Sequence, residues 1–279
     1  MNSSFSISTQ RIIELQTLAK EARIKVLNMI DRAQSGHPAG SLDLTEIMVS
    51  LYFEVLNIRP NQPQWPKRDY LFLSNGHICP ILYACLNMRG FFPAIQLQTL
   101  RQINSKLQGH PKFGLLSGIE NTSGSLGQGL SQACGLALAL KRDHQPNRVF
   151  CIMSDGEQQE GQIWESYQFI NKYQLNNLVS IIDRNQIQIE GMTESVMPLN
   201  DLEDKLHGFG LNVIQIDGHH FPAIMSGFFQ ASLSTNPCVI IANTTPGKGV
   251  SFMENNYQWH GKVPNKTELA QAIKELEQA

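Results

Sequence analysis

The sequence has few of the features that mark a membrane, disulfide-bonded or nucleic-acid-binding protein. Its five cysteines include no C-x-x-C pair and are odd in number, so we expect buried thiols rather than disulfides or a zinc site. No apolar run approaches the ~18 residues that span a bilayer, and the start lacks the pattern of a secretory signal. With 22 basic against 24 acidic residues and no basic run, nucleic acid is not an expected partner. We therefore expect a cytoplasmic enzyme.

What the sequence does have is a regular alternation of strand and helix patterns. Short apolar runs predict strands at 70–73, 149–153, 178–182, 213–216 and 238–242. Helical spacing predicts helices from Ser8 or Thr9 to Ser35, and at 42–56, from 78, at 130–142, around 163–170, at 223–233 and at 266–279. This alternation predicts an α/β fold with one doubly wound, mainly parallel sheet and helices on both faces. We expect a single domain over residues 1–279.

Two polar side chains stand at the ends of successive predicted strands. Asp155 precedes Gly156 after one strand, and Asn185 follows the next. In parallel sheets ligands bind at this edge, and a helix opening after Gly156 would offer backbone N–H groups to an anion. Oxygen ligands such as these, together with phosphate, suit Mg²⁺ or Ca²⁺. The residues alone also allow a simpler explanation, a turn at Asp155 and a capping role for Asn185.

Four of the eight histidines, each beside a glycine in a predicted loop, are candidates for chemistry. The four are His37, His77, His110 and His260. Imidazole suits proton transfer because its pKa lies near ~6.5. A single loop histidine is more often a solvated or capping residue, so these positions become informative only as a set.

The order of these motifs resembles one enzyme family. The chain is similar to the N-terminal subunit of a split transketolase, a thiamine diphosphate-dependent enzyme. The segments that carry the resemblance are Ser35-Gly36-His37-Pro38, Leu73-Ser74-Asn75-Gly76-His77, Gln108-Gly109-His110-Pro111, Gly124-Ser125-Leu126-Gly127-Gln128-Gly129, Ser154-Asp155-Gly156, Glu157-Gln158-Gln159-Glu160-Gly161, Asn185 and Trp259-His260-Gly261. Together they span nearly the whole chain.

The resemblance implies a metal and cofactor site. Asp155, Asn185 and the backbone carbonyl of Ile187 would bind Mg²⁺ or Ca²⁺, and Gly156 would contact the diphosphate. Further cofactor contacts would come from four other positions, with the aminopyrimidine at Gly124 and Leu126, the thiazolium at Ile189, and Glu160 near the cofactor at a subunit contact. Ordinary core packing would explain Leu126 and Ile189 equally well, and a turn would explain Gly124.

The resemblance also assigns the histidines. His77 and His260 would contact the cofactor diphosphate and the reacting carbonyl region. His37 and His110 would hydrogen-bond the hydroxyl and carbonyl oxygens of a ketose. The implied reaction is transfer of a two-carbon ketol unit from a ketose to an aldose, either of which could be a phosphate ester.

A partner chain follows from the same resemblance. Family members activate the cofactor with a glutamate on a pyrimidine-binding domain, and 279 residues hold only the diphosphate-binding domain. We therefore expect the chain to be inactive alone and to need a C-terminal transketolase subunit, in an α2β2 heterotetramer. We expect no membrane partner.

Two departures from the family pattern bear on efficiency. Ser154 stands where a glycine is usual, and Ile78-Cys79-Pro80 follows His77 where small residues are usual, so the pocket wall there is expected to be narrower. A pseudoenzyme stays possible on these grounds.

Other functions share only part of this pattern. The α subunit of a 2-oxo acid dehydrogenase shares the metal motif but lacks the Ser-Gly-His-Pro and Trp-His-Gly segments, and a deoxyxylulose phosphate synthase is one long chain. A non-catalytic thiamine diphosphate-binding or regulatory subunit would not need the histidines. The stretch Pro246-Gly247-Lys248-Gly249 lacks the spacing of a nucleotide-binding loop.

Overall fold

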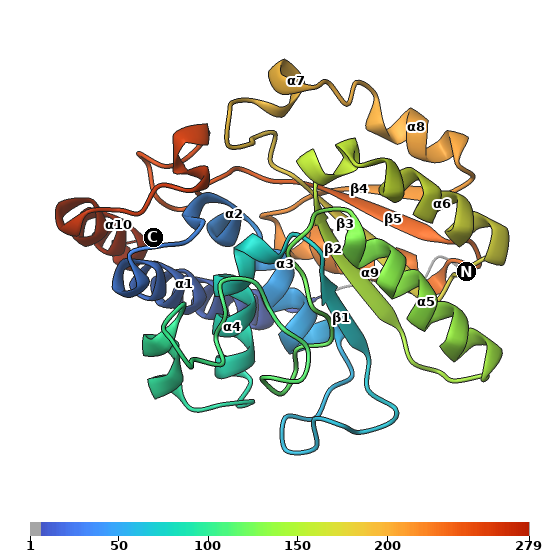
Figure 1. The fold of residues 1–279 in the computed structure, drawn as a ribbon, viewed down its shortest axis with the longest axis horizontal. Coiled ribbons are helices and arrows are strands. Elements are labelled where there is room, and N and C mark those ends of the chain that lie inside the picture. The colour runs from blue at the N-terminus through green and yellow to red at the C-terminus, as the bar shows by residue number, and fades with distance from the viewer. Residues whose placement is uncertain (1–6, 279) are drawn as a thin grey trace.

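The structure is a computed structural model that describes residues 7–278. Five parallel strands form one sheet in the order β1-β2-β3-β5-β4 (Figure 1). The strands are β1 (Tyr70–Leu73), β2 (Val149–Ser154), β3 (Leu178–Arg184), β4 (Asn212–Asp217) and β5 (Cys238–Asn243). Each lies where an apolar run predicted it, so the predicted α/β fold with a parallel sheet is confirmed.

Alternate residues of each strand belong to two separate cores. In β2, Phe150 and Ile152 pack into one core, whereas Cys151 and Met153 pack into the other. A strand that is buried on both faces is apolar at every position, which explains its unbroken apolar run. The helices therefore cover both faces of the sheet, as Figure 1 shows.

The first core lies under α1 (Thr9–Ala33), α4 (Cys79–Met88), α9 (Phe221–Leu233) and α10 (Lys266–Gln278). The second lies under α5 (Gln128–Arg142), α6 (Gly161–Tyr173) and α8 (Leu202–Gly208). A short helix, α7 (Thr193–Val196), lies in the segment between β3 and α8.

The longest helix begins and ends as its sequence predicts. The Ser8 hydroxyl accepts a hydrogen bond from the Arg11 N–H, with 3.2 Å between Oγ and N. This side-chain cap satisfies one of the free N–H groups at the start of α1. At the other end, Gln34 adopts a left-handed conformation with φ of 48°, which stops the helix just before Ser35.

The helix predicted at 42–56 is instead broken into pieces. It begins earlier, at Pro38, and consists of α2 (Pro38–Asp43), α3 (Thr45–Ser50) and a π-helical turn at Leu51–Val55. Leu44 interrupts it with φ of −79° and ψ of 6°. Every residue of α2 and α3 is buried, so packing on all sides sets this geometry, and helical spacing could not reveal it.

Two expectations from composition can be compared with the structure. All five cysteines are buried free thiols, as predicted. Within residues 7–278, no helix combines the length and apolar character that crossing a bilayer requires.

Candidate active site

Asp155 and Asn185 lie at the same edge of the sheet because their strands are neighbours. Ser154 of β2 pairs with Asp183 of β3, and the Asp155 N–H donates to the Asp183 carbonyl at 3.0 Å. The Gln186 N–H, directly after Asn185, donates to Asp155 Oδ2 at 2.8 Å. The structure thus brings together the two side chains that the sequence predicted to meet.

Two buried acids fix the orientation of the Asn185 amide. Its Nδ2 donates to Asp43 at 2.9 Å and to Asp183 at 3.0 Å, whereas its Oδ1 accepts from the Ile187 N–H at 3.1 Å. Burial raises the pKa of Asp183 to about 8, and burial together with the Asp183 charge raises the pKa of Asp43 well above its ordinary value. Asp43 ends α2, and α2 begins directly after His37, so one short helix connects this edge to a predicted histidine.

The donor atoms at this edge fit a hard cation that also binds phosphate. Among the described residues, no cluster of three histidine, cysteine or acidic side chains could hold a metal by itself. The candidate oxygens are instead the carboxylate of Asp155, the amide of Asn185 and the backbone carbonyl of Ile187, two residues further along the chain. Mg²⁺ typically takes one or two protein ligands of this kind and completes its shell with phosphate oxygens and water.

The backbone after Asp155 differs from the prediction. A 3-10 turn, η4 (Gly156–Gln159), follows Asp155, and the α-helix begins only at Gly161. A Cβ at Gly156 would lie 2.6 Å from Gln188 Nε2, so a side chain here would collide with the segment that follows β3. Only the end of the Gln188 side chain lies this close, and Gly156 itself adds no side chain between its backbone and a ligand.

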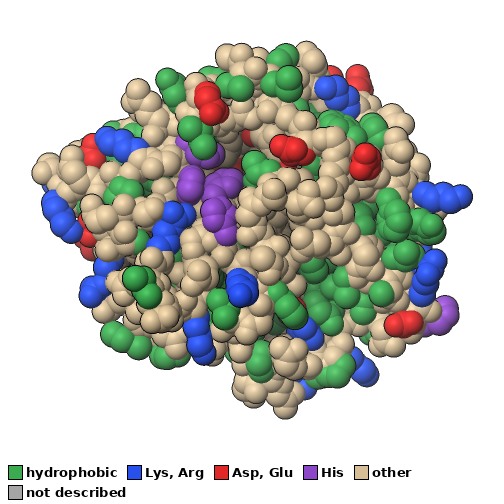
Figure 2. All heavy atoms as spheres, in the orientation of Figure 1, with side chains coloured by type: hydrophobic (Ala, Val, Ile, Leu, Met, Phe, Trp, Pro, Cys, Tyr) green, Lys and Arg blue, Asp and Glu red, His purple; other side chains and the backbone are tan. Residues whose placement is uncertain are grey.

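Three of the predicted histidines meet in space. The ring centroids are 4.9 Å apart for His37 and His77, 5.5 Å for His37 and His260, and 5.3 Å for His77 and His260. They come from the start of α2, from η2 (Gly76–Ile78) and from η5 (Tyr257–His260). Figure 2 shows histidine side chains gathered in a hollow of this face.

The fourth predicted histidine borders this cluster. A Cβ at Gly76, next to His77, would lie 3.3 Å from His110 Cδ2. His110 is exposed, and the other three rings are half-buried. The structure therefore brings all four predicted histidines to one place.

Burial keeps these imidazoles neutral. It lowers the pKa of His37 to about 4, with a further contribution from the charges of His260, Arg101 and His110. Burial is also the main cause that lowers the pKa of His77, His110 and His260. A neutral imidazole carries one donor and one acceptor nitrogen, which is what proton exchange with a sugar hydroxyl requires.

Several buried polar atoms around the cluster have no hydrogen-bond partner among the described residues. They are His37 Nδ1, both amide atoms of Asn75, and Ser123 Oγ. Asn75 precedes Gly76 and His77, and a Cβ at Gly76 would overlap the Ser123 hydroxyl. Buried polar groups are almost always satisfied, so several orphans in one place indicate a site for a polar ligand or ordered water.

The remaining predicted cofactor residues lie mostly at the surface. Ile189 is 66% exposed, so the alternative that it serves core packing is wrong. Gly124 and Glu160 are exposed and Leu126 is half-buried.

Ser154, the first departure from the family pattern, contacts Glu157, a residue that sequence reasoning missed. The Ser154 hydroxyl accepts from the Glu157 N–H at 3.3 Å, and the buried Glu157 carboxylate accepts from Ser74 Oγ and, at 2.5 Å, from the Gly127 N–H. Glu157 thus ties together the ends of β1 and β2 and the glycine-rich loop. Burial raises its pKa to about 7.

The second departure, Ile78-Cys79-Pro80, places buried side chains in the core. The Ile78 side chain is buried, and a Cβ at Gly40 would lie 2.9 Å from Ile78 Cγ2, so this side chain packs under α2. The Cys79 thiol is directed to the Gly109 carbonyl at 3.2 Å. Both side chains contact neighbouring segments of the chain.

Sequence reasoning also missed two arginines. Arg184 forms an ion pair with Asp155, and Arg101 contacts the loops of His37 and His110. A charged residue at the end of a buried strand was a signal for Arg184. Arg101 carries no comparable signal, because its contacts are distant in sequence.

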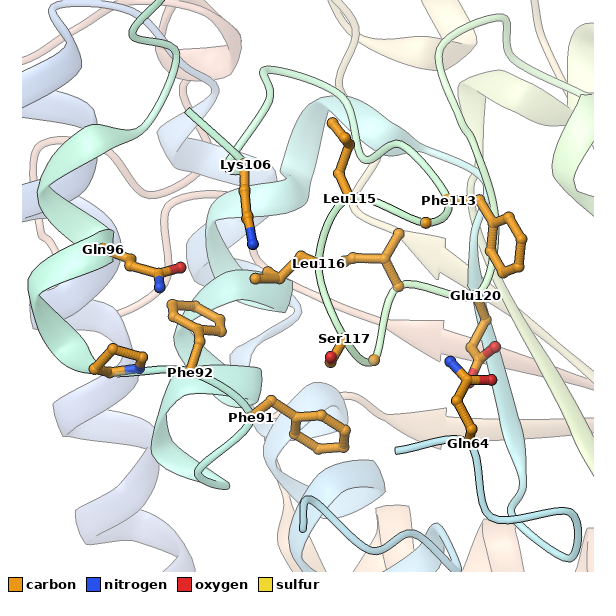
Figure 3. Close-up of a pocket in the computed structure, with 14 residues that line it drawn as sticks. Gln64, Phe91, Phe92, Gln96, Lys106, Phe113, Leu115, Leu116, Ser117 and Glu120 are labelled. Atoms are coloured by element: carbon orange, nitrogen blue, oxygen red, sulfur yellow. The ribbon is translucent and has the colours of Figure 1, made fainter. Parts of the chain in front are cut away.

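A separate hollow of about 410 Å³ contains none of the predicted site residues. Figure 3 shows Phe91, Phe92 and Gln96 on one side of it and Leu115, Leu116 and Ser117 on another, with Lys106 at its edge. Its phenylalanine and leucine walls lack the grouped titratable side chains of the histidine cluster. The sheet edge and the four histidines therefore remain the candidate active site.

A parallel sheet with an oxygen-donor edge, linked by one short helix to a cluster of neutral histidines, defines a cofactor-binding α/β domain. Residues 15–277 match the family described as "Transketolase, thiamine diphosphate binding domain". The chain therefore belongs to the transketolase family and carries its thiamine diphosphate-binding domain.

Its relatives include both separate subunits and longer enzymes. It is 41% identical to a 6-deoxy-6-sulfo-D-fructose transketolase subunit of Clostridium sp. (strain MSTE9), over 96% of this chain and 98% of the relative. It is 37% identical to an apulose-4-phosphate transketolase subunit of Phocaeicola vulgatus, over 95% of this chain and 93% of the relative.

A solved transketolase from Campylobacter jejuni matches with a TM-score of 0.91 and 32% identity, over 97% of this chain but 43% of the longer one. The predicted resemblance to subunits of split transketolases is confirmed by these matches. The predicted class of activity, a transferase of the transketolase family, is confirmed with it.

Proposed function

We propose that this chain is the diphosphate-binding half of a two-subunit transketolase, which transfers a two-carbon ketol unit from a ketose to an aldose. The observation that supports it best is the meeting of His37, His77 and His260, from three distant segments, with ring centroids at most 5.5 Å apart. Near-complete coverage of two relatives that are named as transketolase subunits supports the division into two chains.

The sheet edge is the proposed metal and diphosphate site. Asp155, the Asn185 amide oxygen and the Ile187 carbonyl would hold Mg²⁺ or Ca²⁺, and the bare backbone at Gly156 would admit a diphosphate oxygen. When bound, thiamine diphosphate supplies the nucleophilic carbon and the electron sink for cleavage of a carbon–carbon bond. Gly124, Leu126, Ile189 and Glu160 complete the proposed cofactor contacts on this chain.

The histidines position the sugar and move protons. His37 and His110 would hydrogen-bond its hydroxyl and carbonyl oxygens, and His77 and His260 would lie between the reacting carbonyl and the diphosphate. Because burial lowers the pKa of all four rings, each is neutral near pH 7 and has an acceptor nitrogen free to face a hydroxyl. Three of the four rings are half-buried.

The site is completed by a second chain. The exposure of Ile189, a proposed cofactor contact, is consistent with a partner that covers it. We propose that residues 1–279 form one diphosphate-binding domain, that the pyrimidine-binding domain lies on a C-terminal subunit, and that two copies of each assemble in the cytoplasm. Both relatives are named for sugars that carry a sulfonate or a phosphate, so the proposed substrates are sugars with an anionic group.

The test is calorimetric titration of thiamine diphosphate with Mg²⁺ into this chain, with and without the product of a neighbouring gene that encodes a pyrimidine-binding domain. We expect metal-dependent binding that tightens with the partner, and ketol transfer only when both chains are present. Asp155→Asn should abolish binding, whereas Asp204→Asn, which changes an exposed carboxylate on α8, should leave it unchanged.

The outcomes separate the alternatives. Ketol transfer by this chain alone at an ordinary enzymatic rate would refute the two-subunit proposal. Cofactor binding by both chains without any transfer, across phosphorylated and sulfonated ketoses, would identify a non-catalytic subunit. Absence of binding even with the partner would refute the cofactor site.

A further inference from the structure

Arg101 joins two loops that each carry a histidine of the cluster. Its Nη1 donates to the Ser35 hydroxyl at 2.7 Å, two residues before His37, and its Nη2 donates to the Gly109 carbonyl at 3.3 Å, one residue before His110. These segments are more than 70 residues apart in sequence. A single guanidinium therefore spans them.

The backbone at Arg101 and the backbone at Gly109 both restrict the position of this side chain. Arg101 has a left-handed φ of 59°, which is unusual for a residue other than glycine, and its N–H donates to the Leu107 carbonyl at 2.9 Å. A Cβ at Gly109 would lie 2.9 Å from Arg101 Nε. Glycine at 109 is thus required for the close approach of the guanidinium.

We infer that Arg101 is a positioning residue that holds the His37 loop and the His110 loop in one arrangement around the substrate. The inference deepens the proposed function and rests on it for the identity of that substrate. A planar guanidinium donates in two fixed directions at once, whereas an ammonium is a point charge on a flexible stem. The role therefore requires arginine and not only a positive charge.

The two loops depend on Arg101 to different degrees. The carbonyl of Gly109 also has the Cys79 thiol at 3.2 Å, and the Tyr83 hydroxyl donates to the Gln108 carbonyl at 2.8 Å. Among the described residues, the Ser35 hydroxyl has Arg101 as its hydrogen-bond partner. Loss of Arg101 should therefore free the Ser35 loop while the backbone near His110 stays anchored.

Arg101 also places a positive charge beside the histidines. Burial lowers the pKa of His110, and the charge of Arg101 lowers it further. The pKa of His37 is lowered by burial and then by the charges of His260, Arg101 and His110, whereas Glu190 opposes the effect of burial on His260. The pKa of His110 is therefore expected to depend on the charge of Arg101. The position of the His37 ring is expected to depend on the hydrogen bond between Arg101 and Ser35. Figure 2 shows basic side chains bordering the histidines.

The test is an NMR titration of the histidine rings in the full chain, for the wild type and for Arg101→Gln, Arg101→Lys and Ser35→Ala. In Arg101→Gln we expect the pKa of His110 to rise by about half a unit, because a nearby positive charge is removed. In Arg101→Lys the charge stays, so the pKa of His110 should stay near that of the wild type while the His37 signals shift or broaden. Ser35→Ala should alter His37 alone. The ring of the exposed His144 is the internal control.

A second readout uses the assembled two-chain enzyme. Arg101→Gln should lower kcat and raise KM for the sugar about tenfold or more, with unchanged affinity for thiamine diphosphate, because its hydrogen-bond partners, Ser35 and Gly109, are not proposed cofactor contacts. Gly109→Ala should reproduce this effect with Arg101 present, since the added Cβ displaces the guanidinium. If Arg101→Gln fails to fold, Arg101→Lys, Ser35→Ala and Gly109→Ala still test the inference.

The inference would be overturned if the titration curves and the chemical shifts of His37 and His110 were all the same in the Arg101 variants as in the wild type. A change that is limited to a lower Tm, with kinetics like those of the wild type, would also overturn it. Failure of thiamine diphosphate to bind the wild type would refute the proposed function instead, and the ring titrations would be unaffected by that result.

Discussion

Arg184 donates a hydrogen bond to Asp155, with 2.7 Å between Nη1 and Oδ2. Its positive charge therefore lies beside the carboxylate that is proposed as a metal ligand. Its Nη2 donates to Glu194 at 2.6 Å, and Glu194 in turn accepts from the Leu199 N–H at 3.2 Å. One guanidinium therefore connects the sheet edge to the segment around α7. Burial raises the pKa of Asp155, and the Arg184 guanidinium opposes that rise.

Removing that guanidinium should strengthen metal binding. Mg²⁺ entering the site would be repelled by Arg184 and would have to share or break its ion pair with Asp155. We expect Arg184→Gln to lower the Kd for Mg²⁺, in the presence of thiamine diphosphate, by about three- to tenfold, as measured by calorimetry. Arg11→Gln, which removes an ion pair near the start of α1, is the matched control and should have no effect. Equal or weaker Mg²⁺ binding in Arg184→Gln would contradict this prediction.

The buried histidine cluster should make the protein less stable in acid. Burial lowers the pKa of His37 from its ordinary 6.5 to about 4, so the unfolded chain binds this proton more readily than the folded one. The stability that the neutral ring contributes is therefore present above pH 6.5 and is lost as the pH falls from 6.5 toward 4, by up to about 3 kcal/mol.

Urea unfolding at pH 7.5 and pH 5 checks this. His37→Asn should lose less stability than the wild type between the two pH values, whereas the exposed His144→Asn should lose as much. An equal loss in His37→Asn and the wild type would show that other groups cause the acid sensitivity.

A buried ion pair anchors α3 to α1. Arg23 Nη2 and Glu46 Oε2 are 2.7 Å apart, and both side chains are less than 10% exposed. Burial raises the pKa of Glu46, but Arg23 and His219 outweigh it and lower the pKa to about 2. Glu46→Gln would leave a buried guanidinium without its counter-charge, which should cost about 3 kcal/mol of the free energy of unfolding.

The contrast is the exposed pair of Lys262 and Glu268, at 2.6 Å. Glu268→Gln should cost less than about 1 kcal/mol, because water solvates both of these charges. Both free energies of unfolding are measured with denaturant. Similar losses for Glu46→Gln and Glu268→Gln would show that burial does not make the Arg23–Glu46 ion pair the more important of the two.

Two glycines of α5 should respond in opposite ways to alanine. A Cβ at Gly129 would lie 2.7 Å from the Ser74 backbone, so Gly129→Ala should push the helix from the end of β1 and cost about 1–3 kcal/mol. Gly135 has nothing within 4 Å of such a Cβ, and Gly135→Ala should stabilise the helix by about 0.5–1 kcal/mol. Thermal unfolding of both variants gives the signs. Destabilisation by Gly135→Ala would contradict this prediction.

Much of the fold and part of the site could be predicted from the sequence. The five strands were predictable because a strand between two helix layers is mostly apolar, and even the more exposed β4 keeps buried Ile214 and Ile216 at alternate positions. Asp155 and Asn185 were predictable as neighbours, since both follow strands of one parallel sheet. The break at Leu44 and the 3-10 turn at Gly156 were not predictable, because local spacing does not record packing from several sides.

The sequence by itself determined the order of strands and helices, the family and the identity of the four histidines, because these depend on local composition and on motifs read along the chain. Only the tertiary structure decided that Arg184 neutralises Asp155, that Arg101 joins the loops of His37 and His110, and that Ile189 is exposed. Such relationships join residues that are distant along the chain or depend on burial, and their geometry exists only once the sheet and its helices have packed.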